Sequence, residues 1–176
     1  ASLALGLGKY IVDGGLTLRV SPYHPDQVMQ TSEVETALRE TQTQFYALDM
    51  SDVGSDFKVN DGFNIMKLKV KDAEYDKSLN YIVSTFDPYD QMIYDGLYDG
   101  GRKIISFAGV LQQDVFPLPE ILQMSMKYGA GAMRRPVEIE FACNINEDKT
   151  GEFYLLQIRP IVEAKGMLEE DITKTS

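Results

Sequence analysis

The chain has 176 residues, of which 44% are hydrophobic and 25% charged, a composition typical of a globular protein with a core of its own. Its formal net charge of -10 argues against nucleic acid or an anionic membrane as the main partner. No apolar run reaches the roughly 18–20 residues of a membrane span. The single cysteine, Cys143, excludes an intramolecular disulfide and favours a reducing compartment, so we expect a cytoplasmic protein.

The first third of the chain predicts turns and short elements. The first residue is Ala1 and not a methionine, which suggests that the chain is an excised part of a longer polypeptide. The glycine-rich residues 5–15 lack the Gly-Lys-Ser/Thr of a phosphate-binding loop and predict a structural turn. Residues 16–20 alternate and predict a short strand. His24 follows between two prolines, where we expect a structural or solvated side chain.

The middle of the chain mixes helical and strand patterns. We expect a short helix over residues 31–39, strands over 44–49 and 63–70, and an exposed loop over 51–62. Apolar residues at helical spacing predict an amphipathic helix over residues 73–85.

The following segment is rich in tyrosine. Residues 89–98 predict packing turns, with Tyr-Asp-Gly at 94–96 and again at 98–100, and residues 102–111 predict a strand. Pro119 is suited to the first turn of a helix over residues 119–132, which the glycines at 129–131 loosen or end. We expect the methionines near this helix to fill the core; these are Met124, Met126 and Met133.

Two alternating runs near the end of the chain predict an antiparallel β-hairpin. They span residues 137–142 and 153–160, and the polar, turn-rich residues 144–151 connect them. Pairing Glu140 with Gln157 sets Glu138 opposite Arg159. The other face then pairs Val137, Ile139 and Phe141 with Leu156, Ile158 and Pro160.

This register gathers two carboxylates, an amide and a guanidinium on one face of the hairpin. Carboxylate and amide oxygens are hard ligands that suit Mg²⁺, and arginine presents a planar fork to phosphate oxygens. The alternative is a solvated sheet face with one Glu138–Arg159 ion pair, and the pattern alone favours it, because such exposed pairs are common.

The two runs also resemble a known family. Residues 136–142 (Pro-Val-Glu-Ile-Glu-Phe-Ala) and 153–161 (Phe-Tyr-Leu-Leu-Gln-Ile-Arg-Pro-Ile) resemble the nucleotide-binding domain of phosphoenolpyruvate synthases and pyruvate phosphate dikinases, an ATP-grasp fold. Glu138 stands where the family usually has aspartate, whereas Glu140, Gln157 and Arg159 match directly. The opening Gly-Leu-Gly-Lys resembles the family's Gly-Leu-Gly-Glu, with Lys9 in place of the glutamate.

The resemblance implies a site and a reaction. Glu140 and Gln157 are expected to coordinate the Mg²⁺ of bound ATP, and Arg159 is expected to contact the terminal phosphate and act as the catalytic residue. The parent protein would transfer a phosphoryl group from ATP, through a histidine elsewhere, to pyruvate or a related acceptor. It could also form a homo-oligomer. Two alternatives are a related dikinase with another acceptor and a non-catalytic nucleotide-binding regulatory module.

The resemblance also sets the expected domain organisation. Residues 1–166 would be the C-terminal part of an ATP-grasp domain of α+β class, mainly antiparallel sheet with packed helices. Residues 29–102 carry no matching motif and would be an elaboration, and residues 167–176 a tail or linker. The half of the domain that grips adenine, the domain with the phosphorylated histidine and the pyruvate-binding barrel are all missing. The chain alone is therefore expected to be inactive.

Overall fold

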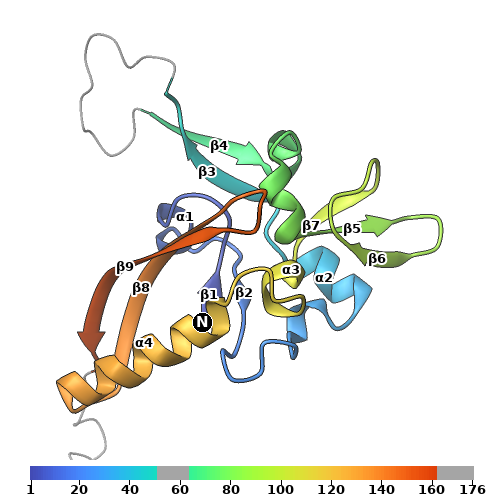
Figure 1. The fold of residues 1–176 in the computed structure, drawn as a ribbon. Helices are drawn as coiled ribbons and strands as arrows, with labels where there is room; N and C mark the ends of the chain where they lie inside the picture. Colours follow the sequence, from blue (N-terminus) through green and yellow to red (C-terminus); the bar gives the residue numbers. More distant parts are fainter. Residues whose placement is uncertain (51–63, 162–176) are drawn as a thin grey trace, which may run out of the picture.

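The computed structural model describes residues 1–50 and 64–161. Figure 1 shows the chain as a series of short strands and helices, of which α4 (Leu118–Met133) is the longest helix. In chain order the elements are β1 (Ser2–Leu3), α1 (Lys9–Val12), β2 (Leu18–Arg19), η1 (Met29–Thr31), α2 (Val34–Glu40), β3 (Gln44–Leu48), β4 (Ile65–Lys69), η2 (Val70–Ala73), η3 (Lys77–Tyr81), β5 (Val83–Asp87), β6 (Met92–Asp95), β7 (Arg102–Ile105), α3 (Ala108–Leu111), α4 (Leu118–Met133), β8 (Val137–Ile145) and β9 (Gly151–Pro160).

The strands within the described residues form four small sheets, and every strand pair is antiparallel. Three sheets are two-stranded (β1–β2, β3–β4 and β8–β9), and the fourth has the order β6-β5-β7. Two-stranded sheets are marginal on their own, so each depends on a shared core. The mixture of helices with antiparallel sheets confirms the α+β class.

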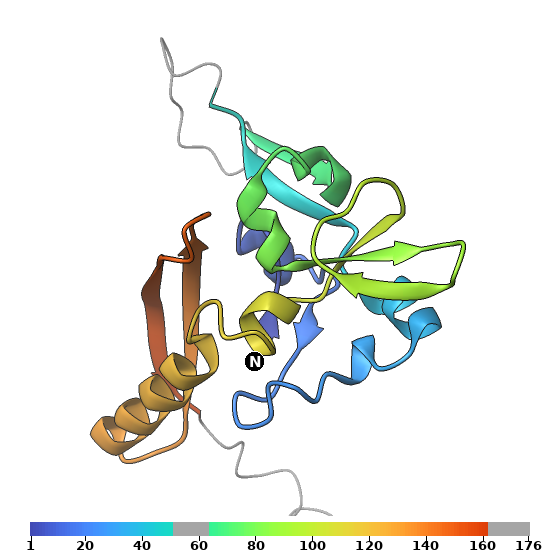
Figure 2. The same cartoon turned by 45° about the vertical axis from the view of Figure 1, so that its right-hand side comes forward.

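One apolar cluster joins the elements. It is contributed mainly by β1, β2, β5, β7, α3 and α4, with the members Leu3, Leu18, Val20, Val28, Val70, Leu79, Val83, Ile105, Phe107, Val110, Leu111, Phe116, Leu118 and Leu122. Apolar side chains of β8 and β9 pack against this cluster, so the C-terminal hairpin is anchored to the N-terminal half. Figure 2 shows α4 lying along the hairpin.

The predicted helix over residues 73–85 is wrong. The segment forms the short 3-10 helices η2 and η3 and then strand β5, which pairs with both β6 and β7. Val83 is 1% exposed and Ser84 is fully buried, so both faces of this central strand are covered. β-Branched Val83 and Thr85 favour a strand, and pairing on two sides outweighs the helical spacing of the apolar residues.

The predicted strand over residues 102–111 is correct only in its first part. β7 ends at Ile105 because Phe107 adopts a left-handed backbone conformation (φ 53°) and begins α3. The amides of Ser106 and Phe107 both donate to the carbonyl oxygen of Ile82, at 3.0 and 2.9 Å. This turn therefore follows from backbone hydrogen bonds to a remote segment.

Helix α4 runs further than predicted, through Gly129 and Gly131 to Met133. A Cβ atom on Gly129 would lie 2.4 Å from Cδ1 of Ile158, so glycine here allows the hairpin to approach the helix closely. The expectation that the methionines fill the core is wrong for Met124 and Met133, whose side chains are exposed.

The tyrosine-rich residues 89–98 form the β6 hairpin rather than packing turns. Tyr89 is 98% exposed, and Tyr94 and Tyr98 are also exposed. The other predicted elements are confirmed with shorter bounds, as β2, α2, β3 and β4. The loop expected over residues 51–62 and the tail expected over 167–176 lie outside the described residues.

None of the helices in residues 1–50 and 64–161 is both long enough and apolar enough to cross a membrane.

Candidate functional site

The hairpin predicted from the sequence is present, with the predicted pairs at its open end. β8 and β9 pair Glu138 with Arg159 and Glu140 with Gln157. The intervening pairs, Val137 with Pro160 and Ile139 with Ile158, also follow the prediction. Since directly opposed residues share a face, the four polar side chains lie on one side of the hairpin.

The predicted pairing of Phe141 with Leu156 is wrong. The register shifts between Glu140 and Phe141, so Phe141 faces Leu155, and Leu156 has no opposed residue in β8. Leu156 is 65% exposed instead of packing on the apolar face. The extra residue makes a β-bulge.

The bulge reconciles two registers that are set at opposite ends of the hairpin. At the tip, the Asn146 amide donates to the Thr150 carbonyl at 2.8 Å, and Lys149 takes a left-handed conformation (φ 67°). At the open end, Ile158 packs against Gly129 of α4. The strand register at the tip and the register at the open end differ by one residue. Leu156 is the extra residue in β9 that accommodates this difference.

The inner face holds the hairpin in place. The rings of Phe141 and Phe153 stack with centroids 5.5 Å apart, and both pack against the central cluster. At the tip, the Tyr81 hydroxyl donates to the carbonyl oxygen of Glu147, and Lys77 Nζ lies 3.8 Å from a Glu147 carboxylate oxygen. These contacts leave the polar face directed to solvent.

Glu138 is the partner of Arg159. Arg159 Nε donates to Glu138 Oε2 at 3.0 Å, and both side chains are about half exposed. This hydrogen bond raises the pKa of Arg159, and the nearby charge of Glu140 raises it further. The contact engages Nε, which leaves the two terminal Nη groups to act as a fork toward an anion.

Glu140 and Gln157 provide two hard oxygen donors that face each other across the strands. Both side chains are exposed. A carboxylate oxygen and an amide oxygen in this arrangement fit part of the coordination shell of Mg²⁺, whose remaining positions are filled by water and phosphate oxygens. Among residues 1–50 and 64–161 there is no cluster of three or more Asp, Glu, His or Cys side chains that could hold a metal ion.

The polar face extends beyond the four predicted residues. Tyr154 opposes Ala142, and Glu152 opposes Asn144, both on the same side as Glu140. The Tyr154 hydroxyl donates to Glu152 at 2.5 Å, and this hydrogen bond raises the pKa of Tyr154. The sequence register missed Tyr154 because, without the bulge, Ala142 would have faced Leu155.

The other sequence candidates lie elsewhere. The segment with Gly6 and Lys9 packs on β3, where the Leu7 amide donates to the Tyr46 carbonyl at 3.0 Å. His24 is exposed in a turn, as expected, with its amide donating to the Ser21 carbonyl at 3.0 Å.

Cys143 is a half-buried free thiol and lies on the inner face of the hairpin, against the core. Burial raises its pKa to about 11, so the thiol stays protonated at neutral pH and is a poor nucleophile.

Comparison of the chain with protein-family models, with curated proteins and with solved structures gives no match. Function is therefore inferred from the residues of the chain and their geometry.

Proposed function

We propose that the chain contributes the Mg²⁺–ATP phosphate-binding hairpin of an ATP-grasp phosphotransferase that resembles phosphoenolpyruvate synthase. Glu140 and Gln157 would hold Mg²⁺, and Arg159 would bind the terminal phosphate of ATP. The bound metal would bridge phosphate oxygens and neutralise the charge that develops during transfer. Pyruvate or a related acceptor would bind to other domains of the parent protein.

The observation that carries the proposal is the pairing at the open end of the hairpin. Glu140 opposes Gln157, and Glu138 opposes Arg159, on an exposed strand face. Side chains on paired strands are held more firmly than side chains on loops, which suits a reaction that depends on positioning and electrostatics. The Glu138 hydrogen bond fixes Nε of Arg159 and so turns the guanidinium in one direction.

The charge pattern of this face suits a metal-bound phosphate better than a free one. Glu138 and Glu140 repel a bare anion, and Arg159 is the single cation of the four paired side chains. A divalent cation held by Glu140 and Gln157 would offset the carboxylate charge and allow phosphate oxygens to approach. Mg²⁺ and ATP are therefore proposed to bind together.

The test uses the parent protein. Glu140→Ala and Gln157→Ala should each abolish ATP-dependent phosphorylation of the parent's histidine while leaving the fold intact by circular dichroism. Glu152→Gln is the matched control, because Glu152 lies on the same face of β9 but outside the proposed set. Near-normal phosphoryl transfer in both alanine variants would overturn the assignment.

The chain alone tests the expected incompleteness of the site. Calorimetric titration of the 176-residue chain with Mg²⁺–ATP should give weak or undetectable binding, because the half of the domain that holds adenine is expected to lie elsewhere. Tight binding would show that these residues already form a complete nucleotide site.

A further inference from the structure

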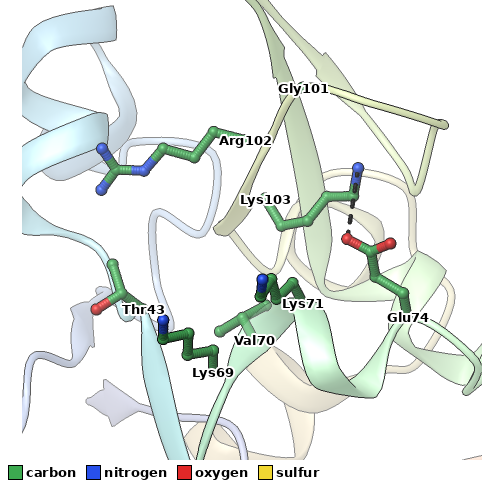
Figure 3. A pocket seen from close by; sticks show the side chains of 8 residues that line it. All are labelled: Thr43, Lys69, Val70, Lys71, Glu74, Gly101, Arg102 and Lys103. Carbon is green, nitrogen blue, oxygen red and sulfur yellow. Dashed lines mark ion pairs between the residues drawn. The ribbon is translucent and has the colours of Figure 1, made fainter.

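A hollow with an unusual charge lies between two of the sheets, away from the hairpin. It has a volume of about 350 Å³ and lies where β4 and η2 meet the start of β7 (Figure 3). Its lining residues are Thr43, Lys69, Val70, Lys71, Glu74, Gly101, Arg102 and Lys103. This volume is in the range of small-molecule sites.

Four of the eight lining residues are cations, and one is an acid. The whole chain has 17 basic and 27 acidic residues and a formal net charge of -10, so the lining of the hollow is opposite in charge to the chain as a whole. Gathering like charges in one place is unfavourable unless something offsets them. The positions of the four cations and their partners therefore decide what the hollow can do.

Two of the cations have structural partners. The Lys103 side chain is buried, and its Nζ donates to the carbonyl oxygens of Tyr98, at 2.6 Å, and of Gly100; it also lies 3.8 Å from a Glu74 oxygen. One terminal nitrogen of Arg102 donates to the carbonyl oxygen of Leu38, which leaves the other N–H groups of the guanidinium to donate to a ligand.

The other two cations are exposed, and the neighbouring Asp72 carboxylate accepts the backbone N–H of Lys69 at 2.8 Å. Within the part of the chain that the structure describes, neither Lys69 nor Lys71 forms an ion pair with a carboxylate. In Figure 3 Lys69, with Thr43 beside it, lies across the hollow from Arg102, whereas Lys71 lies between Lys69 and Lys103, whose side chain turns toward Glu74. Two ammonium groups, part of a guanidinium and a hydroxyl thus line one small volume.

The backbone fixes the side of the hollow that carries Arg102 and Lys103. Gly100 and Gly101 both take left-handed conformations (φ 71° and 60°), and they turn the chain directly into β7. A Cβ atom on Gly101 would lie 2.4 Å from the carbonyl oxygen of Phe86, so this turn requires glycine. The two basic residues are therefore held on a strand that is already paired with β5.

We propose that this hollow is a binding site for the phosphate groups of a small phosphorylated molecule, separate from the hairpin. A phosphate or pyrophosphate group has the charge to offset several cations and accepts hydrogen bonds from ammonium, guanidinium and hydroxyl donors at once. The small volume and the acidic surroundings exclude a polyanion such as nucleic acid as the ligand.

The test titrates the full 176-residue chain with inorganic pyrophosphate and follows backbone amides by ¹H–¹⁵N NMR. EDTA is present, so metal-dependent binding at the hairpin cannot contribute. Saturable shifts should centre on residues 69–71 and 100–103, and they should be absent around Glu140 and Gln157. An absence of saturable binding, or shifts confined to the hairpin, would overturn the proposal. The proposed function does not depend on this outcome.

A pair of matched double variants tests the location. Lys69→Gln with Lys71→Gln should weaken pyrophosphate binding on the order of tenfold or more, because each charged hydrogen bond contributes substantially. Lys67→Gln with Lys127→Gln removes the same charge; Lys67 is on the same strand as Lys69 but does not line the hollow. The control should bind within about twofold of the unchanged chain, and equal weakening in both pairs would overturn the proposal.

A charge reversal provides a second variant that does not depend on the first. Lys71→Glu changes an exposed side chain and should leave the thermal midpoint unchanged. It should abolish saturable binding, since it places an additional carboxylate in the hollow. Retention of binding by folded Lys71→Glu would contradict the proposed site.

Discussion

The hairpin face and the basic hollow are both polar surfaces that suit phosphate, but the chain builds them differently. The hairpin face comes from two consecutive strands, is exposed, and carries two carboxylates against one cation. The hollow comes from β4, η2, β7 and residues beside them in the chain, among them Thr43 just before β3, and carries four cations against one carboxylate. In the two proposals, the first surface would need a metal ion before it could accept phosphate, whereas the second would need none.

The arrangement of side chains on the hairpin face depends on the register of two neighbouring strands, whereas the arrangement in the hollow depends on tertiary packing. The hairpin side chains keep their arrangement as long as two neighbouring strands pair. The basic residues of the hollow meet only when the β3–β4 sheet and the β6-β5-β7 sheet are both formed. Mutations that loosen the packing should therefore affect the hollow before the hairpin face.

The largest expected effect is at the glycine turn that leads into β7. Gly101→Ala should lower the free energy of unfolding by about 3 kcal/mol, because it combines a left-handed backbone conformation with a clash against the Phe86 carbonyl. Pyrophosphate binding should weaken with it. Urea denaturation measures the change.

Gly131→Ala is the control for this substitution. Gly131 lies inside α4, and among the described residues outside the nearby helix backbone no atom would lie within 4 Å of a Cβ atom at this position, so alanine should raise the stability by about 0.5–1 kcal/mol. A similar loss in both variants would show that the Gly101 turn has no special requirement.

The inner face of the hairpin can be tested through its cysteine. The pKa of Cys143 is raised to about 11 by burial, so its thiolate becomes abundant only as the pH rises toward that value. At pH 8 iodoacetamide should modify Cys143 about a hundredfold more slowly in the folded chain than in urea. Equal rates would mean that the hairpin does not pack on the core.

The bulge predicts different costs for two neighbouring apolar side chains. Ile158→Ala should cost about 2 kcal/mol of stability, because Ile158 packs on Gly129 of α4, whereas exposed Leu156→Ala should cost less than about 0.5 kcal/mol. Urea denaturation of both variants checks the difference. A larger loss of stability for Leu156→Ala than for Ile158→Ala would contradict the bulge and support the regular register predicted from the sequence.

The smallest effect on stability is expected at the exposed ion pair. Glu138→Gln should leave the urea midpoint unchanged within error, because both side chains are solvated. In the proposed parent protein it should lower the phosphorylation rate less than Glu140→Ala, since in the proposal Glu138 would orient Arg159 without holding the metal. A larger loss than that of Glu140→Ala would make Glu138 the main ligand.

The features that could be predicted from the sequence are those that depend on local strand register, and the features that depend on tertiary packing could not be predicted. Alternation and a polar turn were sufficient to pair Glu140 with Gln157, because the hairpin register depends on nearby residues. The same spacing rules mistook the segment of Val83 for a helix, since its burial depends on two strands that follow it. Lys69 and Arg102 gave no sequence signal of proximity, because only the packing of separate sheets brings them together.

The bulge at Leu156 also determines where the chain can change in length. Before it, Phe153 and Leu155 fall on the same side of the hairpin as Phe141. After it, this side is taken by Ile158 and Pro160, so its positions in β9 change from odd to even numbers. Deleting Leu156 would straighten the ladder and keep every pair on its present face. Deleting a residue elsewhere in β9 would turn part of the strand over. Single-residue gaps are therefore expected to be tolerated at this one point of the strand.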